Sequence, residues 1–272
     1  MFDRTRHLAQ TRLVDPDTEW TRRRLQVLLG IAVVVVLGLV AGGVWSVVSM
    51  LTGTGASGDA GSEADLSAQD RLANEQLPEA PLEAAQPGSL SSGETGTIQI
   101  PPPMEVGEVG VATGFPQTPE GALAQLAAID STALSSASVR VAQDVITEWA
   151  APGGPTAESW SGVQGLAALL ESAGMSSDAQ NTITIAVEPK MGFIKGTVGD
   201  DFVIPCIDFI ITATTSAEQP QQVAAADCQR MVWQDDRWVI GEGEEPAPAP
   251  SLWPGSQPSF DAGYQWLEVP QS

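Results

Sequence analysis

The stretch "FVIPCIDFIITAT", Phe202–Thr214, is apolar at consecutive positions, which predicts a strand covered on most of both faces. Its one proline, Pro205, has no N–H for a strand ladder and predicts an edge or a bulge near that point. Upstream, "NTITIAVE" alternates apolar and polar residues, and "MGFIKGTV" predicts a second strand. Downstream, "QVAAADCQRMVW" and "WVIGEG" flank the turn "QDDR". The region therefore predicts five consecutive antiparallel strands.

Before these strands the apolar period is helical. Thr118 is a good N-cap, Pro119 suits the first turn, and Leu123, Leu126 and Ala127 fall on one face. A second helix is predicted from about residue 138 to the breaker "APGGP", and a third from about residue 156 to residue 174. The apolar positions expected to face inward in these two helices are Ala142, Val145, Ile146, Trp149, Trp160, Val163, Leu166, Ala167 and Leu170. Helices followed by strands predict an α+β domain over 111–245, with three helices packed on a curved antiparallel sheet.

The two cysteines lie in consecutive predicted strands. A hairpin symmetric about residue 217 places Cys206 opposite Cys228. Opposed residues at a close, non-hydrogen-bonded site have the spacing that a disulfide needs. We therefore predict a bridge, with two buried free thiols as the alternative.

An uncharged apolar segment, Leu25–Leu51, is long enough to cross a bilayer and predicts a single transmembrane helix. A cleaved signal peptide is the alternative, but its apolar stretch is usually shorter. Arg22, Arg23 and Arg24 end the preceding arm, 1–24, which predicts a cytoplasmic N-terminus and an extracytoplasmic C-terminal domain in the cell membrane. Trp20 and Trp45 are candidates for the two membrane boundaries, or incidental.

Two further segments flank the predicted domain. Residues 52–110 are rich in Gly, Ser, Pro and acidic residues and predict a disordered linker, with a short helix possible around Glu63–Leu77. Residues 246–272 begin Pro-rich and end aromatic. The aromatic residues of this tail are Trp253, Phe260, Tyr264 and Trp266. We expect them to pack on their own domain by default, with partner binding as the alternative.

Charge and composition limit the chemistry. The formal net charge is -22, and 30 acidic residues against six basic ones follow residue 51, which argues against nucleic-acid binding by the outer domain. The only histidine, His7, lies in the predicted cytoplasmic arm, which excludes a Ser-His-Asp triad in the outer domain. No cofactor, metal site or catalytic residue is predicted. Asp208, inside an apolar strand, is a weak pocket candidate, and an outward or hydrogen-bonded Asp is the alternative.

The segments "TGFPQTPEGALAQLAAID", Thr113–Asp130, and "SLWPGSQPSFDAGYQWLEV", Ser251–Val269, resemble proteins of mobile elements in high-GC Gram-positive bacteria. The order of arm, anchor, stalk and α+β domain resembles bitopic proteins with a nuclear-transport-factor-two-like (cystatin-like cone) outer domain. These include the TcpC-type assembly proteins of conjugation and type IV secretion, and the membrane proteins associated with lipid-import (Mce) systems.

The resemblance implies a non-catalytic, membrane-anchored assembly subunit that self-associates and contacts other subunits of a membrane-spanning complex. The first alternative is a lipid-import accessory protein. The second is a tethered ligand-binding or acid–base enzyme domain with a pocket near Asp208.

Overall fold

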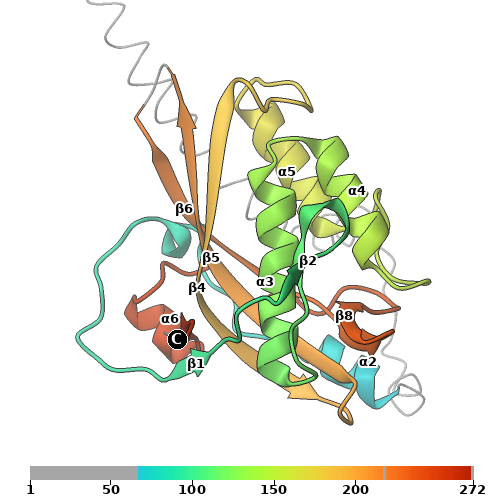
Figure 1. The fold of residues 1–272 in the computed structure, drawn as a ribbon. Coiled ribbons are helices and arrows are strands. Elements are labelled where there is room, and N and C mark those ends of the chain that lie inside the picture. The colour runs from blue at the N-terminus through green and yellow to red at the C-terminus, as the bar shows by residue number, and fades with distance from the viewer. Residues whose placement is uncertain (1–66, 217–218, 271–272) are drawn as a thin grey trace, which may run out of the picture.

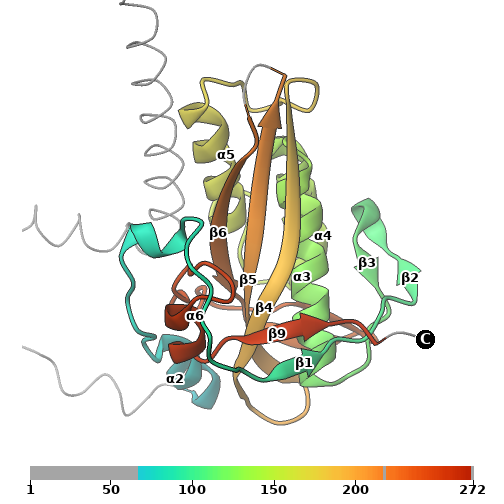
Figure 2. The same cartoon turned by 90° about the vertical axis from the view of Figure 1, so that its left-hand side faces the viewer.

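The computed structural model describes residues 67–216 and 219–270. Three helices lie against one face of a sheet whose longest strands are β4 and β5, as Figures 1 and 2 show. This arrangement confirms the mixed α+β class. The predicted arm 1–24, the predicted transmembrane helix 25–51 and the stretch 52–66 lie outside the described residues, as do Trp20, Arg22, Arg23, Arg24 and Trp45. Within the described part of the chain, no helix has the length and apolar character needed to cross a membrane.

The three helices are α3 (Pro119–Ser135), α4 (Val139–Trp149) and α5 (Ser161–Ser172). The start of α3 is as predicted, because the Thr118 hydroxyl accepts a hydrogen bond from the N–H of Gly121 at 3.1 Å. Helix α5 begins later than predicted, because Thr156 and Ser159 bond each other's backbone N–H groups and hold a turn there. Of the apolar positions expected to face inward, all are buried except Ala167, which is partly buried.

Within the described residues the main sheet has seven strands, in the order β1-β9-β4-β5-β7-β8, with β6 also paired to β5. Their bounds are β1 Thr97–Gln99, β4 Ile183–Thr197, β5 Phe202–Thr215, β6 Gln221–Cys228, β7 Met231–Gln234, β8 Arg237–Ile240 and β9 Gln265–Glu268. Pairing is antiparallel except between β1 and β9, which run parallel. The first two predicted strands are one strand, β4, which has two register shifts against β5. The predicted fourth strand divides into β6 and β7.

Pro205 lies where β5 changes partners. Cys206 still pairs with β6, whereas Val203 pairs with β7, so the ladder is interrupted beside the proline. On the other edge, Pro205 opposes Ile194 next to the second register shift of β4. The missing N–H therefore falls at an irregularity on each side. The predicted bulge is confirmed, but β5 is a central strand and not an edge.

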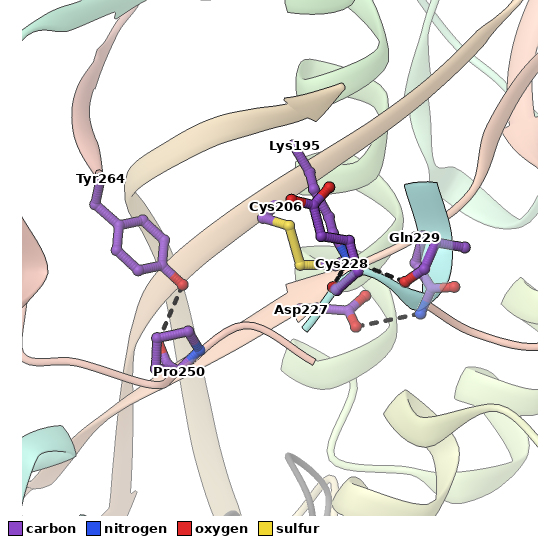
Figure 3. Close-up of a disulfide and its surroundings, with 9 residues drawn as sticks. Lys195, Cys206, Asp227, Cys228, Gln229, Pro250 and Tyr264 are labelled. Atoms are coloured by element: carbon purple, nitrogen blue, oxygen red, sulfur yellow. Dashed lines mark hydrogen bonds between the residues drawn. A yellow bond between two sulfur atoms is a disulfide. The ribbon is translucent and has the colours of Figure 1, made fainter. Parts of the chain in front are cut away.

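Cys206 and Cys228 form a disulfide with an S–S distance of 1.98 Å. They are paired directly across β5 and β6, in the register that symmetry about residue 217 predicts. Their Cα atoms are 4.2 Å apart, as expected for a close, non-hydrogen-bonded pair. Both side chains are buried on the sheet face that the C-terminal segment covers (Figure 3). The predicted bridge is confirmed.

Residues 67–110 belong to the folded body, so the prediction of a disordered linker reaching residue 110 is wrong for them. They form α2 (Ala68–Asn74), the 3₁₀ helix η2 (Leu82–Ala85), β1, β2 (Glu105–Val106) and the 3₁₀ turn η3 (Glu108–Gly110). Strand β2 pairs with β3 (Ala112–Thr113) in a separate hairpin. The short helix expected within 63–77 is present as α2.

Side-chain contacts hold this N-terminal segment on the sheet. Arg230 Nη2 lies 2.8 Å from the Asp70 carboxylate of α2. Lys195 Nζ donates hydrogen bonds to the backbone carbonyls of Ala73 and Glu75. The composition argument fails here because it asks whether a segment can bury its own apolar surface, whereas this one packs on surfaces supplied by other segments.

The C-terminal residues also pack on their own domain, which confirms the default expectation for the aromatic tail. Tyr264 is fully buried, its hydroxyl donates to the carbonyl of Pro250 at 3.0 Å (Figure 3), and its ring meets Phe193 edge-on at 5.0 Å. Trp266 pairs with Met191 of β4. Phe260, in α6 (Gln257–Asp261), contacts Trp266, and Trp253 packs against the main core. These four aromatic side chains are therefore part of the fold in cis.

Removing the disulfide should destabilise the domain without changing its architecture. We expect the double substitution Cys206→Ala and Cys228→Ala to lower the free energy of unfolding by about 3 kcal/mol, because the closed loop no longer restricts the unfolded chain. Urea unfolding followed by tryptophan fluorescence measures this. A reducing agent should lower the wild-type value by a similar amount and leave the double variant unchanged. Equal stability of the oxidised wild type and the variant would contradict the expectation.

Candidate functional site

Asp208 is fully buried in β5, facing the same side of the sheet as Cys206. Among the described residues, neither oxygen of its carboxyl group has a partner at hydrogen-bonding distance and angle. Burial raises the pKa of Asp208 well above its usual value, and the nearby backbone N–H of Leu252 acts in the opposite direction. Asp208 does not line the cleft described below, which lies on the helix side of the sheet. The candidate site is therefore elsewhere.

A second pair of acids joins the helices to the sheet. Asp130 of α3 is buried one turn after Leu126, and Asp227 of β6 precedes Cys228, so that strand alternation turns it away from the cysteine and toward the helices. The two carboxyl groups lie within hydrogen-bonding reach of each other. Their Oδ2 atoms are inaccessible to solvent, and among the described residues neither atom has a hydrogen-bond partner outside the pair. The pair therefore bridges the two layers of the fold.

Polar groups from two other segments complete this cluster. Gln229 Nε2 donates to Asp227 Oδ1 at 3.2 Å (Figure 3). Glu245, after β8, accepts a hydrogen bond from the N–H of Ser161 at the start of α5, at 2.8 Å. The ion pairs among the described residues are Arg140–Asp144, Lys190–Glu188 and Arg230–Asp70. None of them includes an acid of this cluster.

Burial changes the protonation of all three acids. It raises the pKa of Asp130 well above its usual value, with further increases from the charges of Asp227 and Glu245. Burial and the charge of Glu245 raise the pKa of Asp227 to about 7. Burial also raises the pKa of Glu245, although its bond from Ser161 opposes the change. Near neutral pH, Asp227 is therefore close to its titration midpoint, and the raised pKa of Asp130 favours its protonated form.

The acid pair lines a cleft between α3, α5 and strands β4 to β6, with a volume of about 50 Å³. We call it the carboxyl cleft. Its other lining residues are small or apolar except for Ser161: Leu134, Ser161, Gly162, Gly165, Leu166, Leu169, Ile185, Phe209, Ile211, Ala225 and Ala226. Sequence reasoning missed this site. Asp130 on the buried stripe of α3 was the signal, since an acid at an inward position needs a compensating partner.

The β2–β3 hairpin forms a second candidate surface. Its exposed large apolar side chains are Met104, Val106 and Val109, with relative exposures of 84%, 73% and 43%. The backbone of Val109 is left-handed, with φ 48°, which is a strained conformation for a β-branched residue. We call these three side chains the hairpin patch.

The hairpin is fixed to the helices rather than free. Thr113 donates to Gln125 Oε1 of α3 at 2.7 Å, and Gln125 donates to the carbonyl of Ala112 at 3.0 Å. The indole N–H of Trp149 in α4 donates to the carbonyl of Glu108 at 3.3 Å. Figure 2 shows the hairpin beside α4, at the side of the body. An exposed apolar patch is thus held on a rigid support.

Among residues 67–216 and 219–270, no cluster of three or more His, Cys, Asp or Glu side chains has an arrangement that would hold a metal ion. The expectation that the chain has no cofactor stays a prediction.

Comparisons with known proteins identify no family. No protein-family model matches the chain, and neither the curated proteins nor the solved structures contain a significant match. The resemblance to conjugation and lipid-import proteins therefore stays a prediction.

The acid cluster predicts a pH-dependent stability. A carboxyl whose pKa is higher folded than unfolded holds more protons in the folded state between the two values, so folding stability falls as pH rises through that window. For Asp227 the window runs from about 4 to about 7, and the titratable groups that interact with it are Asp130 and Glu245 on its own side of the sheet and Tyr264 on the other side. We expect the free energy of unfolding, measured by urea denaturation, to decrease as the pH rises from 5 to 7, by up to about 1.4 kcal/mol per pH unit for each group.

The control variants separate the cluster from the general acidity of the chain. Asp227→Asn should flatten the pH profile, whereas Asp144→Asn, at an exposed ion-paired carboxylate of α4, should leave it unchanged. An unaltered slope in the Asp227→Asn variant would show that the cluster is not the cause.

Proposed function

We propose that this chain is a non-catalytic assembly subunit of a conjugative transfer or type IV secretion-like apparatus. In this proposal residues 25–51 anchor it in the cell membrane, the N-terminus is cytoplasmic, and the described domain is extracytoplasmic and binds other subunits or further copies of itself. The hairpin patch carries the proposal. Exposed apolar side chains on a rigid projection serve recognition better than catalysis, since they need a partner surface to leave water.

The strain at Val109 supports a recognition role for the patch. A β-branched residue in a left-handed conformation costs of the order of 1 kcal/mol relative to a residue that tolerates it. Strained residues of this kind cluster at functional sites, and here the side chain is exposed. The acidic neighbours Glu105 and Glu108 are also exposed, so the partner chemistry that fits is apolar with surrounding Lys or Arg.

Two further observations agree with an extracytoplasmic scaffold. The Cys206–Cys228 bridge is stable in an oxidising compartment and unusual in a reducing one. The acid pair Asp130 and Asp227 lines a cleft of only about 50 Å³, well below the size of an ordinary substrate pocket, which is about 300 Å³ or more. A role without catalysis suits both.

Site-specific photo-crosslinking in native membranes tests the proposal. A photoreactive residue replacing Val106 should capture subunits of a transfer channel, whereas the same residue replacing the exposed Val269 should not. Capture of lipid-import subunits from position 106 would support the alternative accessory role in lipid import. Recovery of uncrosslinked monomer alone, with the domain folded, would overturn the assembly role.

The hairpin should show a trade-off between stability and binding. We expect Val109→Asn to raise the free energy of unfolding by about 0.5–1 kcal/mol, because Asn tolerates the left-handed backbone, while reducing crosslinking from position 106. The matched control is Val269→Asn, which removes an exposed valine elsewhere and should change neither quantity. A loss of stability in Val109→Asn would show that the valine is not strained.

A further inference from the structure

We propose that the carboxyl cleft binds a small aliphatic ammonium ion, with Asp227 as its counter-charge. This site is distinct from the hairpin patch and does not depend on the assembly role. It is formed by α5 on one side and by β5 and β6 on the other, with Asp130 of α3 beside Asp227.

The walls of the cleft set the chemical class of the ligand. Leu134, Leu166 and Leu169 of the helices face Phe209 and Ile211 of β5 across it. These side chains offer no polar partner, so they favour a group that carries methylenes over a fully hydrated ion. The two acids and Ser161 supply the polar part of the lining. A ligand that matches both parts has an apolar chain and a positive head.

The electrostatics of the cleft call for a cation. Asp130, Asp227 and Glu245 come from three separate segments and take part in no ion pair within the described residues. Outside the pair itself, the Oδ2 atoms of Asp130 and Asp227 have no protein hydrogen-bond partner there. A buried carboxylate without a counter-charge is costly, and an ammonium group offers both a positive charge and three N–H donors.

The volume limits the ligand to a few atoms. About 50 Å³ is several times the ~10–15 Å³ that one water molecule requires, and far below the pocket of a drug-sized ligand. A metal ion is a poorer fit, because the described residues contain no ligating cluster of three or more groups. A short alkylammonium can exchange the hydration of its head group for hydrogen bonds to the carboxyl oxygens, and it gains from burying each methylene.

Thermal unfolding of the purified full-length chain tests the inference without any substitution. Methyl-, ethyl-, propyl- and butylammonium chloride are titrated, with sodium chloride and the matching alcohols as controls. We expect the amines to raise Tm, with apparent affinity increasing about fourfold per methylene until the cleft is full. Equal shifts from sodium chloride, or from the alcohols, would overturn the inference.

Two variants locate the effect. The affinity of each variant is derived from the rise in Tm over its own ligand-free value. Asp227→Asn should bind at least tenfold more weakly than the wild type, whereas the surface control Asp144→Asn should retain wild-type affinity. Ala225→Leu, which fills the wall on β6, should abolish the gain from propyl and butyl chains while methylammonium still binds. Unchanged affinity in the Asp227→Asn variant would place the ammonium group elsewhere. If Ala225→Leu changed the affinity for all four amines by the same factor, this cleft would be excluded as the site.

Discussion

Strand β5 is the constraint on which the rest of the structure depends. It pairs with β4 along one edge and with β6 and then β7 along the other, so neighbouring strands occupy both of its edges. Its alternate side chains are buried on both faces: Ile207 and Phe209 enter the helix-side core, and Ile204 and Cys206 enter the core under the C-terminal segment. Burial on both faces means that two sets of segments, far apart in sequence, must cover this one strand.

The two sets come from opposite parts of the chain. Helices α3 to α5 cover one face, and the C-terminal residues together with α2 cover the other, as Figures 1 and 2 show. The disulfide lies on the second face and joins β5 to β6, where the strand ladder is interrupted beside Pro205. The covalent bond thus joins the two strands at a place where the backbone pairing is interrupted.

Local signals predicted the elements of the fold, and their failure elsewhere has a physical cause. Thr118 marked the start of α3 because an N-cap is decided by a few neighbouring residues. The Cys206–Cys228 register followed from hairpin symmetry, which is also local. Residues 67–110 were misassigned because their order comes from contacts with distant segments, such as Asp70 with Arg230. Composition within a window contains no information about such contacts.

The candidate site was missed for a related reason. In the sequence, only the position of Asp130 on the inward face of α3 distinguishes it from an ordinary surface acid. Its neighbour Asp227 is almost a hundred positions later and belongs to a different type of element. Asp208 attracted attention because its own strand is apolar, yet it faces the other side of the sheet. Which acids meet is decided by the packing of layers, and a single sequence does not specify that packing.

The position of α2 also changes how the domain relates to the proposed anchor. If residues 25–51 span the membrane, the folded body begins about 15 residues later, and even a fully extended chain of that length reaches only about 50 Å. A stalk lasting to residue 110 would allow several times that distance. With that anchor, the ordered segment would keep the hairpin patch and the carboxyl cleft near the membrane, where a partner anchored in the same bilayer would meet them at high effective concentration. Short tethering favours assembly with membrane-bound subunits over capture of freely diffusing proteins.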